Sequence, residues 1–223
     1  MILSLSNWFD SRLISFFGLA VSPGTFIFPL TFSISSIITN VYGYKYARRA
    51  IHVAFLFNTL FIIYGQILIR LPSPSFSIHN NEAFTQILNF DFFIILGSLV
   101  SYLVSEPLNT KIVAKLKIKF NGQFPGLRFI GASILASGVD TLIFTPIAFG
   151  TFFNTDKIIT MAFNIWLIKS LVEIIALPFA LKISTFLEEK EKVDNYDTET
   201  DFSFFKLETN YLISQNKYKD KEL

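Results

Sequence analysis

The stretch IHVAFLFNTLFIIYGQILI, residues 51–69, decides the fold class of this 223-residue chain. It has no Lys, Arg, Asp or Glu, and its length is about what an α-helix needs to cross roughly 30 Å of lipid hydrocarbon. Three other long apolar stretches occur, at residues 92–107, 129–149 and 158–183. The stretch 92–107 reaches spanning length only if its helix continues past Pro107. We therefore expect an all-α, polytopic membrane protein.

The composition agrees with a membrane location. Hydrophobic residues make up 52% of the chain and charged residues only 16%, whereas soluble domains have about 25% charged residues. The 27 Phe residues suit a surface that faces lipid tails. A net charge of +2 is too small to indicate nucleic-acid binding, and the absence of Cys excludes disulfides and thiolate metal sites.

Two further segments bring the expected number of membrane helices to six. Residues 24–42 are rich in Ser and Thr and contain Pro29, which predicts a broken helix packed inside the bundle. Residues 2–21 contain Asp10 and Arg12 and lack the basic start of a signal peptide, so we interpret them as a membrane helix. Two three-helix halves are then plausible, with the Pro29 helix and the Asp140 helix in corresponding places.

The positions of Lys and Arg predict the orientation, because short loops rich in these residues stay in the cytoplasm. One basic group follows the second segment, and another joins the fourth to the fifth, whereas the other connections have only Arg70 and Lys157. Both termini are then cytoplasmic. Residues 1–187 form the predicted membrane domain, and the polar residues 188–223 are expected to be a flexible cytoplasmic tail. The two basic groups are Lys45, Arg48 and Arg49, and Lys111, Lys115, Lys117, Lys119 and Arg128.

Ionisable residues inside apolar segments indicate the functional site, because each costs about 2.5 to 3.5 kcal/mol at the centre of a membrane helix. Asp140 lies in SGVDTLIF, residues 137–144, and Lys169 lies in WLIKSLVEI, residues 166–174. The two side chains either form an interhelical ion pair or coordinate a substrate or ion, and a pair that opens can do both. Glu173 lies four residues after Lys169 on the same helical face and can balance the lysine.

Glu106 stands directly before Pro107, which removes one backbone donor. Either the helix opens there towards a cavity, or it ends there with Glu106 reaching the membrane interface. The remaining amides, among them Asn109, are expected to make interhelical hydrogen bonds. The only histidines, His52 and His79, lie on different segments, and no catalytic or phosphate-binding motif is present, so we expect no metal, no cofactor and no enzyme.

Two blocks of sequence resemble the queuosine precursor transporter family, also called the vitamin uptake transporter family. The first is SPGTFIFPLTFSISSIITNVYGYKYARRAI, residues 22–51, with its Gly-Thr pair, Phe-Pro-Leu-Thr-Phe run and Val-Tyr-Gly followed by basic residues. The second is LRFIGASILASGVDTLIFTPIAF, residues 127–149. The resemblance covers roughly residues 7 to 183, and the family usually has carboxylates at the positions of Ser36, Asn40 and Asn109.

This resemblance implies import of a 7-deazaguanine, such as 7-cyano-7-deazaguanine, 7-aminomethyl-7-deazaguanine or queuine, across a bacterial inner membrane for tRNA modification. An alternative is a substrate-binding membrane subunit of an ATP-energised vitamin uptake system, and a less favoured one is a membrane-embedded enzyme or scaffold. Beyond the lipid bilayer no partner follows, and the oligomeric state stays open. The candidate substrate-binding residues are Asp140, Lys169, Glu106, Glu173, Asn40 and Asn109.

Overall fold

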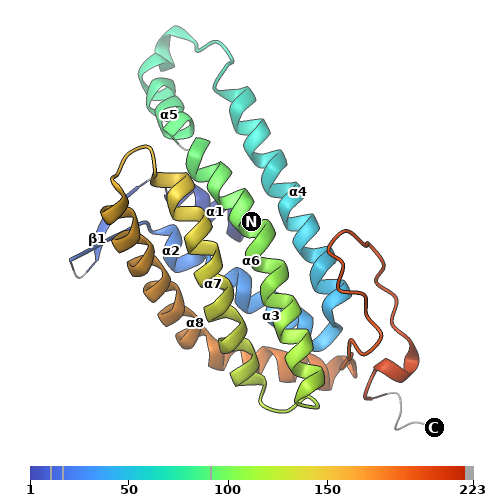
Figure 1. Cartoon of the computed structure of the whole chain (residues 1–223). Coiled ribbons are helices and arrows are strands. Elements are labelled where there is room, and N and C mark those ends of the chain that lie inside the picture. Colours follow the sequence, from blue (N-terminus) through green and yellow to red (C-terminus); the bar gives the residue numbers. More distant parts are fainter. Residues whose placement is uncertain (11, 17, 91, 219–223) are drawn as a thin grey trace.

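The protein is a bundle of long helices, shown in Figure 1 as a computed structural model that describes residues 1–218 except 11, 17 and 91. Five helical stretches are long and apolar enough to cross a membrane, which confirms the expected all-α class. The long helices are α3 (Pro29–Tyr42), α4 (Tyr44–Leu68), α6 (Phe92–Lys119), α7 (Pro125–Phe149) and α8 (Thr155–Glu191). The short helix α2 (Gly24–Ile27) directly precedes α3 and belongs to the same spanning stretch. Shorter elements are α1 (Ile2–Asp10), β1 (Ile14–Phe16), β2 (Leu19–Val21), η1 (Ser75–Ser77), α5 (Ile78–Phe90) and η2 (Ile213–Gln215).

The bundle has an apolar outside and many polar groups inside, as a surface surrounded by lipid requires. Phe57, Leu142 and Ile175 are more than 60% exposed, whereas Asp140 and Lys169 are under 5% exposed. The apolar interior is formed by three clusters along the bundle, which include Phe32 and Tyr102, Val113 and Phe129, and Phe144 and Ile165. The buried polar residues therefore face the inside of the bundle and not the lipid.

The helix that begins at Phe92 does not stop at Pro107. It continues to Lys119 as α6, which gives this segment its spanning length. The interpretation of Pro107 as a helix end, with Glu106 at the interface, is wrong, because Glu106 is 1% exposed. Thr110 Oγ1 donates to the carbonyls of Glu106 and Pro107, both at 3.1 Å, and so adds hydrogen bonds beside the proline.

The segment 24–42 is interrupted at the expected place. Its helix α2 ends at Ile27, and α3 begins at Pro29, where the missing N–H group costs no hydrogen bond. This is the most buried of the five stretches: 61% of its most apolar 18 residues are buried inside the bundle, against 11% for α4. The prediction of a broken helix packed inside the bundle is confirmed.

The predicted membrane helix at residues 2–21 is wrong. The helix α1 ends at Asp10, and the strands β1 and β2 then form an antiparallel hairpin in which Ile14 pairs with Val21. Gly18 has a φ of 80°, a conformation that favours glycine and reverses the chain. The hydroxyl of Ser22 donates to Asp10 Oδ1 at 2.5 Å, so the carboxylate is held inside the bundle. The helix therefore ends at the buried Asp10, where a spanning helix would continue.

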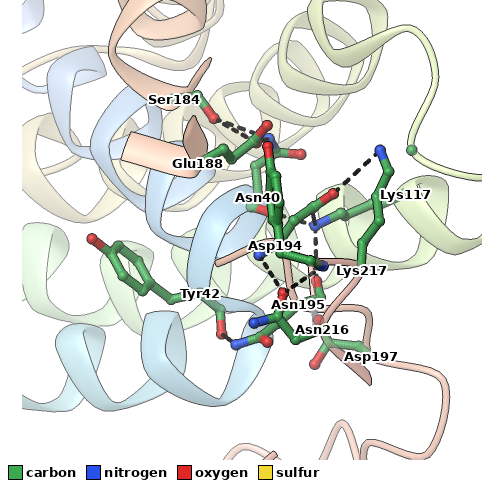
Figure 2. A network of polar contacts seen from close by, with 12 residues as sticks. Asn40, Tyr42, Lys117, Ser184, Glu188, Asp194, Asn195, Asp197, Asn216 and Lys217 are labelled. Carbon is green, nitrogen blue, oxygen red and sulfur yellow. Dashed lines mark hydrogen bonds and ion pairs between the residues drawn. The ribbon is translucent and has the colours of Figure 1, made fainter. Parts of the chain in front are cut away.

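The polar C-terminal segment packs against the bundle, which differs from the expected flexible tail. Figure 2 shows its attachment at the end of α6, where Lys117 Nζ donates to Asp194 Oδ1 at 2.5 Å and to the carbonyls of Asn40 and Asn195. Lys117 is 2% exposed. Residues 219–223 lie outside the described residues. The polar groups of this segment are buried because they satisfy backbone and side-chain groups at the bundle end.

A second attachment holds the turn between α3 and α4. Tyr211 Oη donates to Asp197 Oδ1 at 2.5 Å and accepts from the Lys45 N–H at 3.0 Å, while Asp197 Oδ2 accepts from the Tyr44 N–H. Burial and then the Asp197 carboxylate raise the pKa of Tyr211 above its ordinary value. Gly43 has a φ of 89°, and a Cβ atom at this position would lie 2.2 Å from Tyr211 Oη, so the turn requires glycine here.

Candidate functional site

The centre of the site is an ion pair between α7 and α8. Lys169 Nζ lies 2.6 Å from Asp140 Oδ2, and both side chains are at most 5% exposed. Of the two arrangements that the sequence left open, the structure therefore shows the ion pair. Removing two charges from water is costly, and such a pair is stable only when its geometry is good and further hydrogen bonds satisfy its remaining oxygens and protons.

Groups from α6, from α7 and from the junction of α2 and α3 complete the surroundings of this pair. Ser105 Oγ donates to Asp140 Oδ1 at 3.3 Å. The ammonium group of Lys169 lies 4.5 Å from the centre of the Phe28 ring and 5.7 Å from that of Phe144, within the range of a cation–π interaction. The lysine is thus held by one carboxylate and two aromatic rings.

A second carboxylate, which the sequence analysis did not place in the site, is that of Asp10. It lines the same small cavity as Asp140 and Lys169, together with hydroxyls from three segments. The sequence signal was an Asp within an apolar stretch, but its position depends on the turn after α1. The hydroxyl groups belong to Ser22, Thr25, Ser98 and Ser101.

Gly24 allows Asp10 to approach. A Cβ at this position would lie 2.1 Å from Asp10 Oδ1 and 2.4 Å from the Ser6 carbonyl oxygen. Ser6 Oγ also donates to the Gly24 carbonyl at 3.1 Å. The close contact of α1 with α2 therefore requires glycine here.

The cavity between these groups measures only about 10 Å³, roughly the space of a single water molecule. The two carboxylates and the ammonium group are therefore enclosed. A larger solute can reach them only if helices move apart.

A second polar layer lies one helical turn further along α6 and α8. Ser35 Oγ donates to Glu106 Oε2 at 2.7 Å. The amide nitrogen of Asn109 donates to the Phe32 carbonyl oxygen and to the hydroxyls of Ser35 and Ser36, at 3.0 to 3.2 Å. Glu106 and Asn109 thus connect α6 to α3 directly beside the ion pair.

Glu173 belongs to this second layer but does not balance Lys169 by a direct contact. It is 4% exposed, and its Oε1 has no hydrogen-bond partner among the described residues. The lysine pairs with Asp140 instead. Glu173 is therefore a buried acidic group whose oxygen remains available inside the bundle.

Asn40 lies apart from these two layers. Its amide nitrogen donates to Glu188 Oε1 at 2.5 Å and to Ser184 Oγ at 2.9 Å, and its carbonyl accepts from Lys117 (Figure 2). The structure thus brings together five of the six predicted residues and places Asn40 at the end of the bundle, under the C-terminal segment. Among the described residues no group of three His, Asp or Glu side chains has the arrangement of a metal site.

Comparison with known proteins gives the context of this buried charge cluster. A family model described as "Putative vitamin uptake transporter" matches residues 22–183. The chain belongs to this family. It is 26% identical over 184 residues to a protein of Bacillus subtilis (strain 168) named "Probable queuosine precursor transporter", covering 81% of this chain and 79% of that protein. No solved structure gives a significant match.

Membership of the vitamin uptake transporter family identifies a multi-pass membrane transporter and agrees with the resemblance found in the sequence. The matched residues include Asp140, Lys169, Glu106 and Glu173, whereas Asp10 lies before the matched region. In a transporter, ionisable residues inside the membrane mark the path of the transported solute or ion. The enclosed charge cluster of this family member is therefore its candidate transport site.

Proposed function

We propose that the chain imports 7-deazaguanine precursors of queuosine, such as 7-cyano-7-deazaguanine, 7-aminomethyl-7-deazaguanine or queuine. The name of the Bacillus subtilis relative supports this substrate class. The observation that carries the proposal is the enclosed group of two carboxylates and one ammonium, Asp10, Asp140 and Lys169, beside the rings of Phe28 and Phe144.

This group is chemically complementary to a guanine-like base. A carboxylate accepts two hydrogen bonds from the ring N–H and the exocyclic amino group, an ammonium group donates to the ring carbonyl, and an aromatic face stacks on the heterocycle. We assign Asp140 to the base edge and Lys169 to the ring carbonyl once their ion pair opens. Glu106 is the second candidate for the edge.

The second polar layer extends this assignment towards the end of the bundle where Lys117 holds the C-terminal segment. Glu173 has an unpartnered oxygen among the described residues, and Asn109 faces Ser35 and Ser36. We propose that these side chains receive the base as it leaves the first layer. Asn40 then lies last on this path, at the bundle end covered by the C-terminal segment.

The basic residues support an orientation. Figure 1 shows the turn between α6 and α7 at the same end of the bundle as the C-terminal segment. Helix α4 begins and helix α6 ends at this end of the bundle, and both carry basic residues there, among them Lys45 and Lys119. We propose that this end faces the cytoplasm of a bacterial cell and that α5 lies on the outer side. The cytoplasmic N-terminus stays a prediction.

The proposed function is tested by growth and tRNA analysis in a strain that can neither make nor import queuosine precursors. Expression of the chain with added 7-cyano-7-deazaguanine is expected to restore queuosine in tRNA. The variant Asp140→Asn, at equal membrane abundance, is expected to abolish this restoration. Failure of the unaltered chain to restore queuosine would reject the substrate, and full activity of Asp140→Asn would remove Asp140 from the site.

A further inference from the structure

A second cavity, of about 200 Å³, lies among α1, α4, α5 and α6. Aromatic rings from three of these helices line it, namely Trp8, Phe61, Tyr64 and Phe84. None of the described residues that line it is charged. The cavity is thus apolar and aromatic, unlike the enclosed charge cluster around Asp140.

Two buried amides in its wall lack hydrogen-bond partners. Asn7 is 6% exposed, and neither its Nδ2 nor its Oδ1 has a partner among the described residues. Asn58 is 2% exposed, and although its Oδ1 accepts from Ser4 Oγ at 2.9 Å, its Nδ2 has no described partner. Each buried polar group without a partner costs about 1 to 3 kcal/mol, so these atoms indicate a ligand that supplies the missing bonds.

The chemistry of the wall defines that ligand. The asparagine amide presents a donor and an acceptor side by side, which matches a ring edge with an adjacent acceptor and donor, as when Asn binds an adenine edge. Aromatic side chains stack on planar heterocycles with about 1 to 3 kcal/mol per base. The absence of charge in the described wall favours a neutral ligand. These features together select a neutral, planar heterocycle with an amide-like edge.

The helix α1 connects this cavity with the candidate transport site. Asn7 and Asp10 are three residues apart on α1, and both are buried, so they lie about 4.5 Å apart along the helix axis. Asp10 lines the enclosed cavity next to Asp140, while Asn7 lines the second one. A ligand bound at Asn7 is therefore one helical turn from the charge cluster.

We propose that the second cavity is an outer recognition site, where Asn7 and Asn58 bind the edge of the neutral base 7-cyano-7-deazaguanine before it reaches Asp10 and Asp140. This inference rests on the proposed function, and it adds a site with its own residues. Its position beside α4 and α5 places it on the side that we assign to the outer face. Selection of the base then occurs before the ion pair of Lys169 has to open.

The fluorescence of Trp8 provides a direct test of binding. The chain has two tryptophans, so the variant Trp166→Phe leaves Trp8 as the single reporter in the cavity wall. In purified protein with this change, 7-cyano-7-deazaguanine is expected to quench Trp8 fluorescence in a saturable manner. Adding Asn7→Leu or Asn58→Leu is expected to weaken the apparent affinity at least tenfold, whereas Asn80→Ala, an exposed amide on α5, is expected to leave it unchanged.

Uptake measurements separate this inference from the proposed function. In cells, Asn7→Leu is expected to raise the KM for labelled 7-cyano-7-deazaguanine about tenfold while the maximal rate is retained, and Asp140→Asn is expected to abolish uptake. If the unaltered chain transports the compound but Trp8 does not respond, or if neither asparagine variant changes affinity, the outer site is rejected and the transport function stands. If the unaltered chain does not transport it at all, the proposed function itself fails. The Trp8 titration needs no asparagine variant, so a variant that does not fold leaves the test intact.

Discussion

Lys169 Nζ and Asp140 Oδ2 lie 2.6 Å apart in the interior of the bundle, joining α7 to α8. A buried pair of this kind has a structural effect and a chemical one, and the two are separable. Removal of one partner leaves the other charge buried and unpaired, which costs about 3 to 5 kcal/mol. Removal of both charges avoids that cost.

We therefore expect Lys169→Met and Asp140→Asn to lower the thermal unfolding temperature each, and the double variant to recover most of the loss. Uptake is expected to stay absent in all three, because the charges themselves are needed for the base. Thermal unfolding in detergent and uptake at matched abundance measure the two effects. Normal uptake by the double variant would show that the pair is only structural.

The variant Gly24→Ala tests the position of Asp10. Its new Cβ would lie 2.1 Å from Asp10 Oδ1, so α1 has to move away from α2. We expect uptake to fall at least tenfold while the protein remains folded. The matched control is Gly131→Ala on α7, where a Cβ meets nothing within 4 Å. This control should retain uptake and, as a helix-favouring change, lose no stability. Equal uptake by both variants would contradict a role for the α1–α2 contact.

The parts of the fold that depend on local hydropathy could be predicted from the sequence. The apolar runs of α4, α7 and α8 are long enough to be identified without any tertiary information, and Asp140 and Lys169 stand out because charge is rare there. Pro29 likewise marks the break before α3 because proline acts on its own backbone.

Other features depend on contacts between distant residues and escaped prediction. Asp10 joins the site only because the chain reverses at the β1–β2 hairpin and because Gly24 admits its carboxylate. Lys117 looks like a solvated basic residue of a loop, but it pairs with Asp194, which is 77 residues away. Composition identified the last residues as polar, but it does not show which buried groups they satisfy.

Attachment of the C-terminal segment should depend on Lys117. The variant Lys117→Met removes three hydrogen bonds. Among the described residues, the Asp194 carboxylate, which is 7% exposed, then keeps one ion-pair partner, the exposed Lys217 at 3.6 Å. We expect faster tryptic cleavage after Lys192, measured by mass spectrometry of membranes treated with limiting trypsin. Lys119→Met, an exposed position on the same helix, is the control. Unchanged cleavage in Lys117→Met would show that the other contacts suffice.

Asn109 carries the last prediction, since the family resemblance implies a carboxylate at this position and this chain has an amide. The Asn109 amide nitrogen donates to the Phe32 carbonyl and to the hydroxyls of Ser35 and Ser36, so these acceptors fix it as a donor. In Asn109→Asp, an oxygen would face the Phe32 carbonyl oxygen, and a second acid would lie one turn from Glu106. Each buried group left unsatisfied costs about 1 to 3 kcal/mol.

We therefore expect Asn109→Asp to reduce thermal stability and uptake in this chain. The double variant Asn109→Asp with Ser36→Asn is expected to recover part of both, because the new amide at position 36 can donate to the carboxylate. Thermal unfolding and initial uptake rates of the two variants provide the comparison. Higher uptake by Asn109→Asp alone than by the unaltered chain would instead show that the missing carboxylate limits transport and that the packing of α6 on α3 tolerates it.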